Sequence, residues 1–278
     1  MIASTPKLRP PPGACDTHMH FYDQNVPSAP GGPALPGNFT VAMYRELQAR
    51  LRLQRVIVVQ PNAYRADNRV TLESIRALGT NAKGVGVVGP EVLDPELDRL
   101  TRGGIVAQRF FQLPNGAVGF DKMDQIMARV HPFGWHANLQ LDGRELPKCE
   151  AQIKKLPGKF VIDHIGKFLE PVAPEHEAFK ALLRLVDTGR CWVKLSAPYE
   201  VSKTGAPKFE DVGRLAKALV KHAPERMLWA SNWPHPGAPK DRMPDDANLL
   251  DLLLDWAPDE ATRKKVLVDN PAELYKFA

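Results

Sequence analysis

Two histidines separated by a single residue end an apolar run near the start of the chain. His18 and His20 close the segment Ala14–His20, for which we expect a strand. Side chains two residues apart on a strand point to the same side, so both imidazoles should share one face. Such a pair can bind a divalent metal, or polarise a carbonyl and shuttle protons near neutral pH. Two structural histidines that only form hydrogen bonds would look the same.

A third histidine stands at the end of another apolar segment. His164 follows Asp163 within the segment Phe160–Ile165. Burying an ionisable pair inside an apolar strand is costly unless the pair has a partner or a function. We therefore expect His164 to belong to the functional site. Asp163 either acts there too or orients a neighbouring loop or histidine.

Several groups suited to substrate binding also follow apolar segments. Arg109 is the best candidate for holding a carboxylate, because a guanidinium matches it with two parallel hydrogen bonds. Lys167 can meet a second carboxylate or a ring oxygen, or be a solvated surface lysine. Lys194 is ambiguous, because alternate residues of a strand face opposite sides. Four further candidates can form hydrogen bonds with a substrate: Asn62, Tyr64, Gln140 and Tyr199.

The elements that must position these residues alternate regularly along the chain. The predicted strands are Ala14–His20, Gln54–Gln60, Gly84–Gly89, Ile105–Phe111, Trp135–Leu141, Phe160–Ile165, Cys191–Ser196 and Met227–Ser231. The predicted helices are Val41–Leu53, Arg69–Leu78, Pro95–Arg102, Phe120–His131, Glu145–Leu156, Pro174–Thr188, Phe209–His222 and Asp245–Trp256. A final helix, Asp259–Leu267, and the run Asn270–Phe277 should cover the outside.

Eight strands alternating with eight helices predict the α/β class and a (β/α)8 TIM barrel. A barrel of about 250 residues forms one unit, so we expect a single domain over residues 1–278. The loops after the strands form the active-site face of this fold. The candidate residues, which lie at strand ends, should therefore gather there.

Composition narrows the functional classes. The 278 residues include 37 basic and 32 acidic residues, interspersed along the chain, for a formal charge of +5. This small excess does not predict a nucleic-acid partner, and it fits either a basic pocket or an ordinary solvated surface. The three cysteines have no disulfide or zinc-finger spacing. Without a signal peptide or a membrane-length apolar stretch, we expect a cytoplasmic protein with no membrane partner. Nothing in the sequence indicates an oligomeric state.

The motifs as a set resemble the amidohydrolase superfamily. They are His18-x-His20, His164, Ser231-Asn-Trp-Pro-His235 and Leu267-Val-Asp-Asn-Pro271, and the resemblance spans nearly the whole chain. The sequence is most similar to the small lactone-processing branch, which implies a distorted barrel that acts on a small lactone carrying a carboxylate.

Two positions depart from the metal-dependent pattern of that superfamily. Metal-binding members carry a histidine in the segment Trp135–Leu141, where this chain has Gln140, while His136 lies at the wrong end. They also carry an aspartate where this chain has Asn232. Three histidines can suffice for zinc, but the resemblance implies metal-independent chemistry. Neither a cofactor nor a metal is therefore expected at His18, His20 and His164.

Asn232 also bears on the reaction. An amide cannot take a proton from water, but it can hold a hydroxyl by hydrogen bonds. This favours a nucleophile that is already part of the substrate, as in migration of a lactone within a sugar diacid by intramolecular acyl transfer. The loop Leu113–Val118 is also more similar to the sugar-diacid lactone isomerases of the branch than to its pyrone lactonases.

We therefore expect an enzyme of sugar-acid catabolism. The three histidines would polarise the carbonyl and relay protons, Asn232 would orient the hydroxyl and Arg109 would hold the carboxylate. Two alternatives remain open. One is a metal-independent lactone hydrolase that uses a histidine as its base. The other is a barrel that binds a sugar acid without catalysis.

Overall fold

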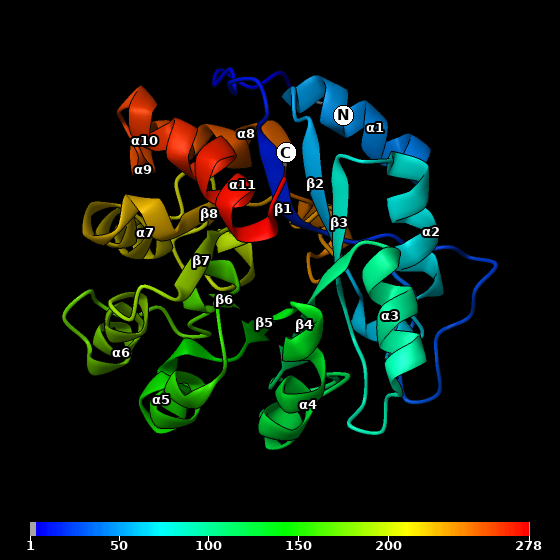
Figure 1. Cartoon of the computed structure of the whole chain (residues 1–278). Helices are drawn as coiled ribbons and strands as arrows, with labels where there is room; N and C mark the ends of the chain where they lie inside the picture. Colours follow the sequence, from blue (N-terminus) through cyan, green and yellow to red (C-terminus); the bar gives the residue numbers. More distant parts are fainter. Residues whose placement is uncertain (1–3, 278) are drawn as a thin grey trace.

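Eight parallel strands form one sheet in which each strand pairs with the next along the chain (Figure 1). The computed structural model describes residues 4–277, so the two ends of the predicted domain, 1–3 and 278, lie outside the described residues. The strands are β1 (Cys15–Met19), β2 (Arg55–Val59), β3 (Ala82–Gly86), β4 (Ile105–Phe111), β5 (His136–Gln140), β6 (Phe160–Ile162), β7 (Cys191–Leu195) and β8 (Met227–Trp229). The predicted (β/α)8 barrel is confirmed.

The ring of strands is closed between β8 and β1 by individual hydrogen bonds. The backbone N–H of Asn232 donates to the carbonyl of His18 at 2.8 Å. The carboxylate of Asp16 accepts from both the N–H of Ser231, at 3.0 Å, and its hydroxyl, at 2.5 Å. The hydroxyl of Tyr44 donates to the same carboxylate at 3.0 Å. This seam holds the ends of the first and last strands at a fixed distance.

The interior of the barrel is filled by buried side chains from successive strands, as expected for this fold. These residues are Cys15, Ile57, Val59, Val85, Ala107, Val161, Trp192 and Leu228. Leu274 and Tyr275, from the last helix, pack against the same cluster. The ring of Tyr275 lies 5.5 Å from that of His136, which begins β5, so the last helix closes the N-terminal end of the barrel. The C-terminal end is left for the site.

Helices surround the sheet and bury their apolar faces against it (Figure 1). They are α1 (Val41–Leu51), α2 (Arg69–Leu78), α3 (Asp94–Arg102), α4 (Met123–Val130), α5 (Leu146–Lys155), α6 (Glu177–Val186), α7 (Glu210–His222), α8 (Asp246–Asp251), α9 (Leu253–Trp256), α10 (Glu260–Lys264) and α11 (Asn270–Tyr275). None of the helices in residues 4–277 has the length and apolar character needed to span a membrane.

The observed bounds differ from the predicted ones in a few places. The helix predicted at Asp245–Trp256 is divided into α8 and α9. The predicted final helix ends early, because a π-helical turn at Lys265–Asp269 leads into α11. β3 lies two residues earlier than expected. These shifts do not change the order of the elements.

Two strands end before the residues predicted for the site. β6 stops at Ile162 and β8 at Trp229, three and two residues before their predicted ends at Ile165 and Ser231. His164 and Ile165 have φ of 53° and 56°, and Asn232 has φ of 59°, in the left-handed region that non-glycine residues rarely occupy. The backbone therefore turns at these points, and such strained residues are frequent at functional sites.

Candidate active site

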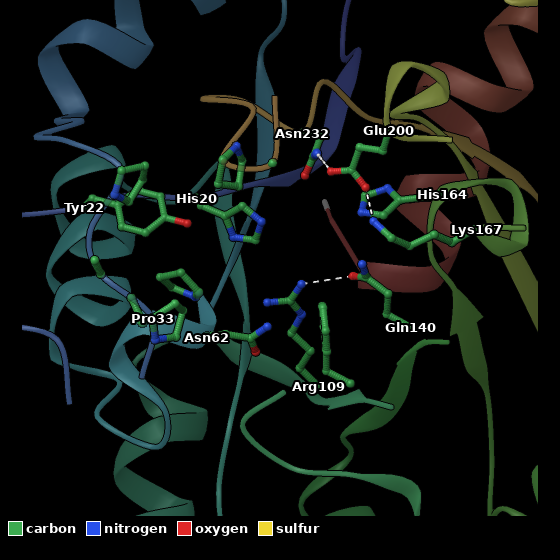
Figure 2. Close-up of a pocket in the computed structure, with 17 residues that line it drawn as sticks. His20, Tyr22, Pro33, Asn62, Arg109, Gln140, His164, Lys167, Glu200 and Asn232 are labelled. Carbon is green, nitrogen blue, oxygen red and sulfur yellow. Dashed lines mark hydrogen bonds and ion pairs between the residues drawn. The ribbon is translucent and has the colours of Figure 1, made fainter. Parts of the chain in front are cut away.

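A cavity of about 330 Å³ opens at the C-terminal ends of the strands (Figure 2). Most of the predicted site residues line it, namely His20, Asn62, Arg109, Gln140, His164, Lys167 and Asn232. The wall also contains Tyr22 and Glu200, which the sequence analysis did not propose. The remaining predictions, His18, Tyr64 and Tyr199, are not part of the wall.

Proline-rich loops form the outer part of the cavity. Pro33 and Pro36, from the long loop after β1, lie in its wall. The guanidinium of Arg65, after β2, donates to the carbonyls of Gly31 and Gly116. Gly31 belongs to the loop after β1 and Gly116 to the loop after β4, so one side chain links three loops. This arrangement fixes the rim opposite Lys167 and Glu200.

The three histidines cluster, but at different depths. His18 is fully buried, and its Nε2 lies 3.2 Å from Nε2 of His20. The ring centroids of His18 and His164 are 4.8 Å apart. His20 and His164 reach the cavity, and His18 lies beneath them. The H-x-H spacing therefore directs both side chains to the interior side of β1, as predicted, but only one of them can touch a ligand.

The histidines are held in the neutral form. Burial lowers the pKa of His20 to about 3, and the Arg109 guanidinium contributes to the decrease. Burial likewise lowers the pKa of His18 and of His164 well below the usual value. Neutral imidazoles can each donate one hydrogen bond and accept another. The cluster can therefore exchange protons without carrying charge at neutral pH.

A buried ion pair supports the cluster from below. Lys194, on β7, places its Nζ 3.0 Å from Oδ1 of Asp163 and 3.1 Å from Nδ1 of His18. It also donates to Oδ1 of Asn138 at 2.8 Å, and the Asn138 amide donates to Asp163 at 2.8 Å. Burial raises the pKa of Asp163, but Lys194 and His18 outweigh it and hold the pKa well below its usual range. The ambiguity over Lys194 is thus resolved, because its side chain points into the barrel.

The same surroundings bear on metal binding. Among the described residues, donor atoms of His18, Asp163 and His164 lie within 4.8 Å of one another, as a metal site would need. The ammonium of Lys194, however, contacts donor atoms of two of the three, at 3.1 Å and 3.0 Å. A fixed cation against the ligand atoms repels a second cation. This donor set does not fit a metal ion.

Arg109 extends from β4 into the cavity (Figure 2). Its guanidinium donates to the carbonyl of Gln60 at 2.8 Å and to Oε1 of Gln140 at 3.0 Å. The residue is 4% exposed, and no carboxylate of the described residues lies within 4.0 Å of it. Gln140, predicted to bind substrate, thus holds Arg109 in place. A buried guanidinium without a carboxylate partner is a ready site for an anion.

Asn232 is held by an acidic residue beside it in the cavity wall, Glu200. Its amide Nδ2 donates to Oε1 of Glu200 at 3.1 Å and to the hydroxyl of Tyr199 at 2.8 Å. Both partners engage the NH2 group, so Oδ1 is the amide atom left for the cavity (Figure 2). Glu200 also pairs with Lys167. Burial raises the pKa of Glu200, but Lys167 and His164 outweigh it and lower the pKa.

The predicted tyrosines act behind the wall rather than in it. The hydroxyl of Tyr64 accepts from the N–H of Asp23 at 2.8 Å and donates to its carbonyl at 3.1 Å, which secures the loop after β1. The hydroxyl of Tyr199 lies 2.9 Å from Nδ1 of His235, whose Nε2 is 3.1 Å from Asp246. His235 therefore secures the last loop. Tyr22, in contrast, directs its hydroxyl toward the cavity (Figure 2).

Known proteins with similar sequences and structures match this chain over nearly its whole length. A family model described as Amidohydrolase matches residues 15–277. The D-galactarolactone isomerase of Agrobacterium fabrum is 37% identical, over 96% of this chain and 92% of that protein. The 2-pyrone-4,6-dicarboxylate hydrolase of Comamonas testosteroni is 32% identical, over 98% of this chain and 93% of that protein. A crystal structure of an Agrobacterium tumefaciens protein in its apo form superposes with a TM-score of 0.92 at 36% identity and covers 99% of both chains.

Proposed function

The chain belongs to the amidohydrolase family, and from that premise we propose that it is an enzyme that moves the ester bond of a carboxylate-bearing lactone. The family was correctly inferred from the motifs at His18, His164 and Asn232. Its relatives are named as a lactone isomerase and as a hydrolase of a cyclic ester. We propose isomerisation of a sugar-diacid lactone, within sugar-acid catabolism, as the reaction.

One observation carries the proposal, the Arg109 guanidinium in the cavity wall. It is buried, fixed by Gln60 and Gln140, and free of any carboxylate partner among the described residues. Leaving a buried cation uncompensated is costly, so the position favours a ligand that supplies a carboxylate. A lactone made from a sugar diacid retains such a carboxylate at its far end.

The opposite wall supplies the groups that the reaction needs. In acyl transfer, a substrate hydroxyl adds to the lactone carbonyl, the ring C–O bond then breaks, and the released oxygen takes up the proton. Lys167 and the imidazole of His164 can stabilise the oxyanion that forms in between. Oδ1 of Asn232 can accept the hydrogen bond of the attacking hydroxyl and orient it. Both reacting groups belong to one molecule, which gives a large entropic advantage.

We propose that the reaction needs no metal. The cavity and the layer beneath it contain three cations, Arg109, Lys167 and Lys194, against two carboxylates, Asp163 and Glu200. Each carboxylate already has a lysine partner. A divalent ion would add charge to a site whose fixed charges already sum to a positive value. Fixed cations and neutral donors replace it in stabilising the oxyanion.

Hydrolysis is the second candidate, and the carboxylate of Glu200 favours it. This group lies in the wall, beside Asn232, where it can orient a water molecule. Its ion pair with Lys167 and its lowered pKa make it a weak base. We therefore place hydrolysis second to isomerisation.

Proton NMR of the purified protein with D-galactaro-1,4-lactone separates the candidates. Isomerisation gives a second lactone as the first product, while the total amount of lactone stays constant. If open-chain diacid is instead the first and main product, the isomerase proposal is rejected. If a panel of carboxylated lactones is left unchanged by the protein yet binds to it, a binding barrel without catalysis is favoured.

A further inference from the structure

A continuous line of buried contacts joins β7 to the cavity through both histidines of β1. Nζ of Lys194 lies 3.1 Å from Nδ1 of His18, and Nε2 of His18 lies 3.2 Å from Nε2 of His20. Nδ1 of His20 lies 2.7 Å from the carbonyl oxygen of Val59, at the end of β2. All three side chains are at most 3% exposed, so these contacts lie away from bulk water.

The carbonyl of Val59, at one end of this line, determines which atom is the donor in each of its hydrogen bonds. The carbonyl of Val59 can only accept, so Nδ1 of His20 must carry a proton. In the neutral ring, Nε2 of His20 then bears a lone pair. His18 must supply the proton of the 3.2 Å contact from its own Nε2. This leaves Nδ1 of His18 with a lone pair, which needs a donor.

Two groups lie within reach of that lone pair, and only one of them is a donor. Asp163 Oδ1, at 3.3 Å, is an acceptor, and Lys194 Nζ, at 3.1 Å, is a donor. An ammonium has three N–H groups. Those of Lys194 have three acceptors: Nδ1 of His18, Oδ1 of Asn138 at 2.8 Å and Oδ1 of Asp163 at 3.0 Å. The network is thereby complete.

We propose that Lys194 is a positioning residue that sets the tautomers of both histidines, with the proton of His18 on Nε2 and that of His20 on Nδ1. Without the ammonium, His18 would donate from Nδ1 to Asp163, as a histidine beside a buried carboxylate ordinarily does. The two Nε2 atoms, 3.2 Å apart, would then face each other with lone pairs. Lys194 thus reverses the donor and acceptor roles of the two nitrogens of His18.

These tautomers determine which residues accept from and donate to the substrate, an inference that rests on the proposed function. Both ring nitrogens of His20, which reaches the cavity, are then engaged, Nδ1 by Val59 and Nε2 by His18, so the acceptor for the substrate hydroxyl is Oδ1 of Asn232. The donor to the lactone carbonyl is then Lys167, while Arg109 holds the carboxylate. The first two histidines of the cluster therefore do not polarise the carbonyl, which modifies the role expected from the sequence.

NMR of protein labelled with 15N-histidine tests the tautomers without reference to activity. Two-bond proton–nitrogen spectra distinguish the protonated ring nitrogen from the bare one, and variants His18→Asn and His20→Asn assign the signals. In the unmodified protein we expect the proton of His18 on Nε2 and that of His20 on Nδ1. A proton on Nδ1 of His18 overturns the proposal.

The variant Lys194→Met tests the cause. We expect the proton of His18 to move to Nδ1, and an unchanged tautomer overturns the proposal. Because this change leaves Asp163 buried without its cation, the double variant Lys194→Met with Asp163→Asn serves as the more stable form. In the double variant, we expect His18 to have no fixed tautomer. Lys83→Met, which removes a lysine that donates to carbonyls of α11 and the residue after it, is the matched control and keeps the original tautomers.

Activity gives a second readout. Since Lys194 does not line the cavity, its loss should lower kcat by about 10²-fold or more while KM changes little. Expected tautomers in a protein inactive on every lactone would refute the proposed function and leave the role of Lys194 intact. Isomerase activity together with the opposite tautomers would support the proposed function and refute the role of Lys194.

Discussion

Asn232 and Glu200 are joined by a hydrogen bond of 3.1 Å across the inner wall of the cavity, from the amide Nδ2 to the carboxylate Oε1. Because a carboxylate only accepts, this contact fixes which end of the amide faces the substrate. The Asn232 amide would lose this fixed orientation if Glu200 could also donate.

The variant Glu200→Gln should therefore lower kcat by about 10-fold, since a glutamine amide can turn either end toward Asn232. It also removes the charge that neutralises Lys167. A dicarboxylate inhibitor such as galactarate should then bind about 10-fold more tightly, as a charge-assisted hydrogen bond becomes available. Steady-state kinetics with and without inhibitor measure both effects. The exposed Glu170, paired with Lys203, provides the control Glu170→Gln, and equal inhibition in both variants would contradict the prediction.

The variant Asn232→Asp would place two carboxylates about as close as the present hydrogen bond. Like charges at this distance share a proton, so one pKa of the pair is raised. We expect kcat/KM to acquire a new ionisation, with activity falling as pH rises through it. A pH–rate profile from about pH 5 to 9 shows the effect against the unmodified enzyme. Identical profiles would mean that the two residues do not interact.

Arg109→Lys tests the carboxylate site. A lysine cannot hold Gln60 and Gln140 while presenting a planar pair of donors, so kcat/KM for a carboxylated lactone should fall about 10²-fold. For the methyl ester of the same lactone the decrease should be only a few-fold. The comparison isolates the ion pair from general damage. Equal losses on both substrates would place the carboxylate elsewhere.

Stability should depend on pH through a histidine far from the cavity. Burial lowers the pKa of His136 to about 3, and Lys194 adds to the decrease. The Nε2 atom of His136 has no hydrogen-bond partner among the described residues. As pH decreases, position 136 takes up a proton in the unfolded chain, where the histidine pKa is near 6.5, before it does so in the folded protein. The free energy of unfolding must then fall as pH decreases from about 6.5 to 3.

His136→Phe removes that proton and keeps a ring against Tyr275. Between those pH values, the slope of unfolding free energy against pH should be shallower by up to about 1.4 kcal/mol per pH unit, the value for one proton. Urea denaturation at several pH values measures the slopes. Parallel curves for the variant and the unmodified protein would show that His136 is not held neutral.

Metal removal should leave turnover unchanged. Lys194 contacts the donor atoms of His18 and Asp163 that a metal would need. Dialysis against a chelator followed by assay, with elemental analysis of the same sample, measures the effect. A loss of activity that one equivalent of Zn²⁺ restores would refute metal-free catalysis.

Much of the arrangement could be predicted from local patterns. The alternation of apolar and amphipathic segments located all eight strands, and the barrel rule placed His20, Arg109 and Asn232 on one face. Tyr64 was misplaced because position after a strand does not tell which way a loop side chain turns. Glu200 was missed for the same reason, since Ala197, with φ of 49°, redirects the chain before it.

Lys194 and Asp163 illustrate a different limit. Each appears in the sequence as a single charge within an apolar strand, and each alone is costly to bury. Asp163 directly follows β6 and Lys194 lies on β7; these strands are neighbours in the sheet, so the two charges can neutralise each other. Pairing the cation of one predicted strand with the anion of the next would have located this ion pair. The hydrogen-bond direction that it imposes on His18 depends on atomic positions and needs the structure.

The seam between β8 and β1 has a consequence for how the enzyme is made. Asp16 and Ser231 are 215 positions apart, so closing the ring is among the last contacts available to a growing chain and among the slowest in refolding. The same seam brings His18 and Asn232 together. A chain that ends before β8 therefore lacks Asn232 and part of the cavity wall. During refolding, we expect turnover to return only once the ring has closed.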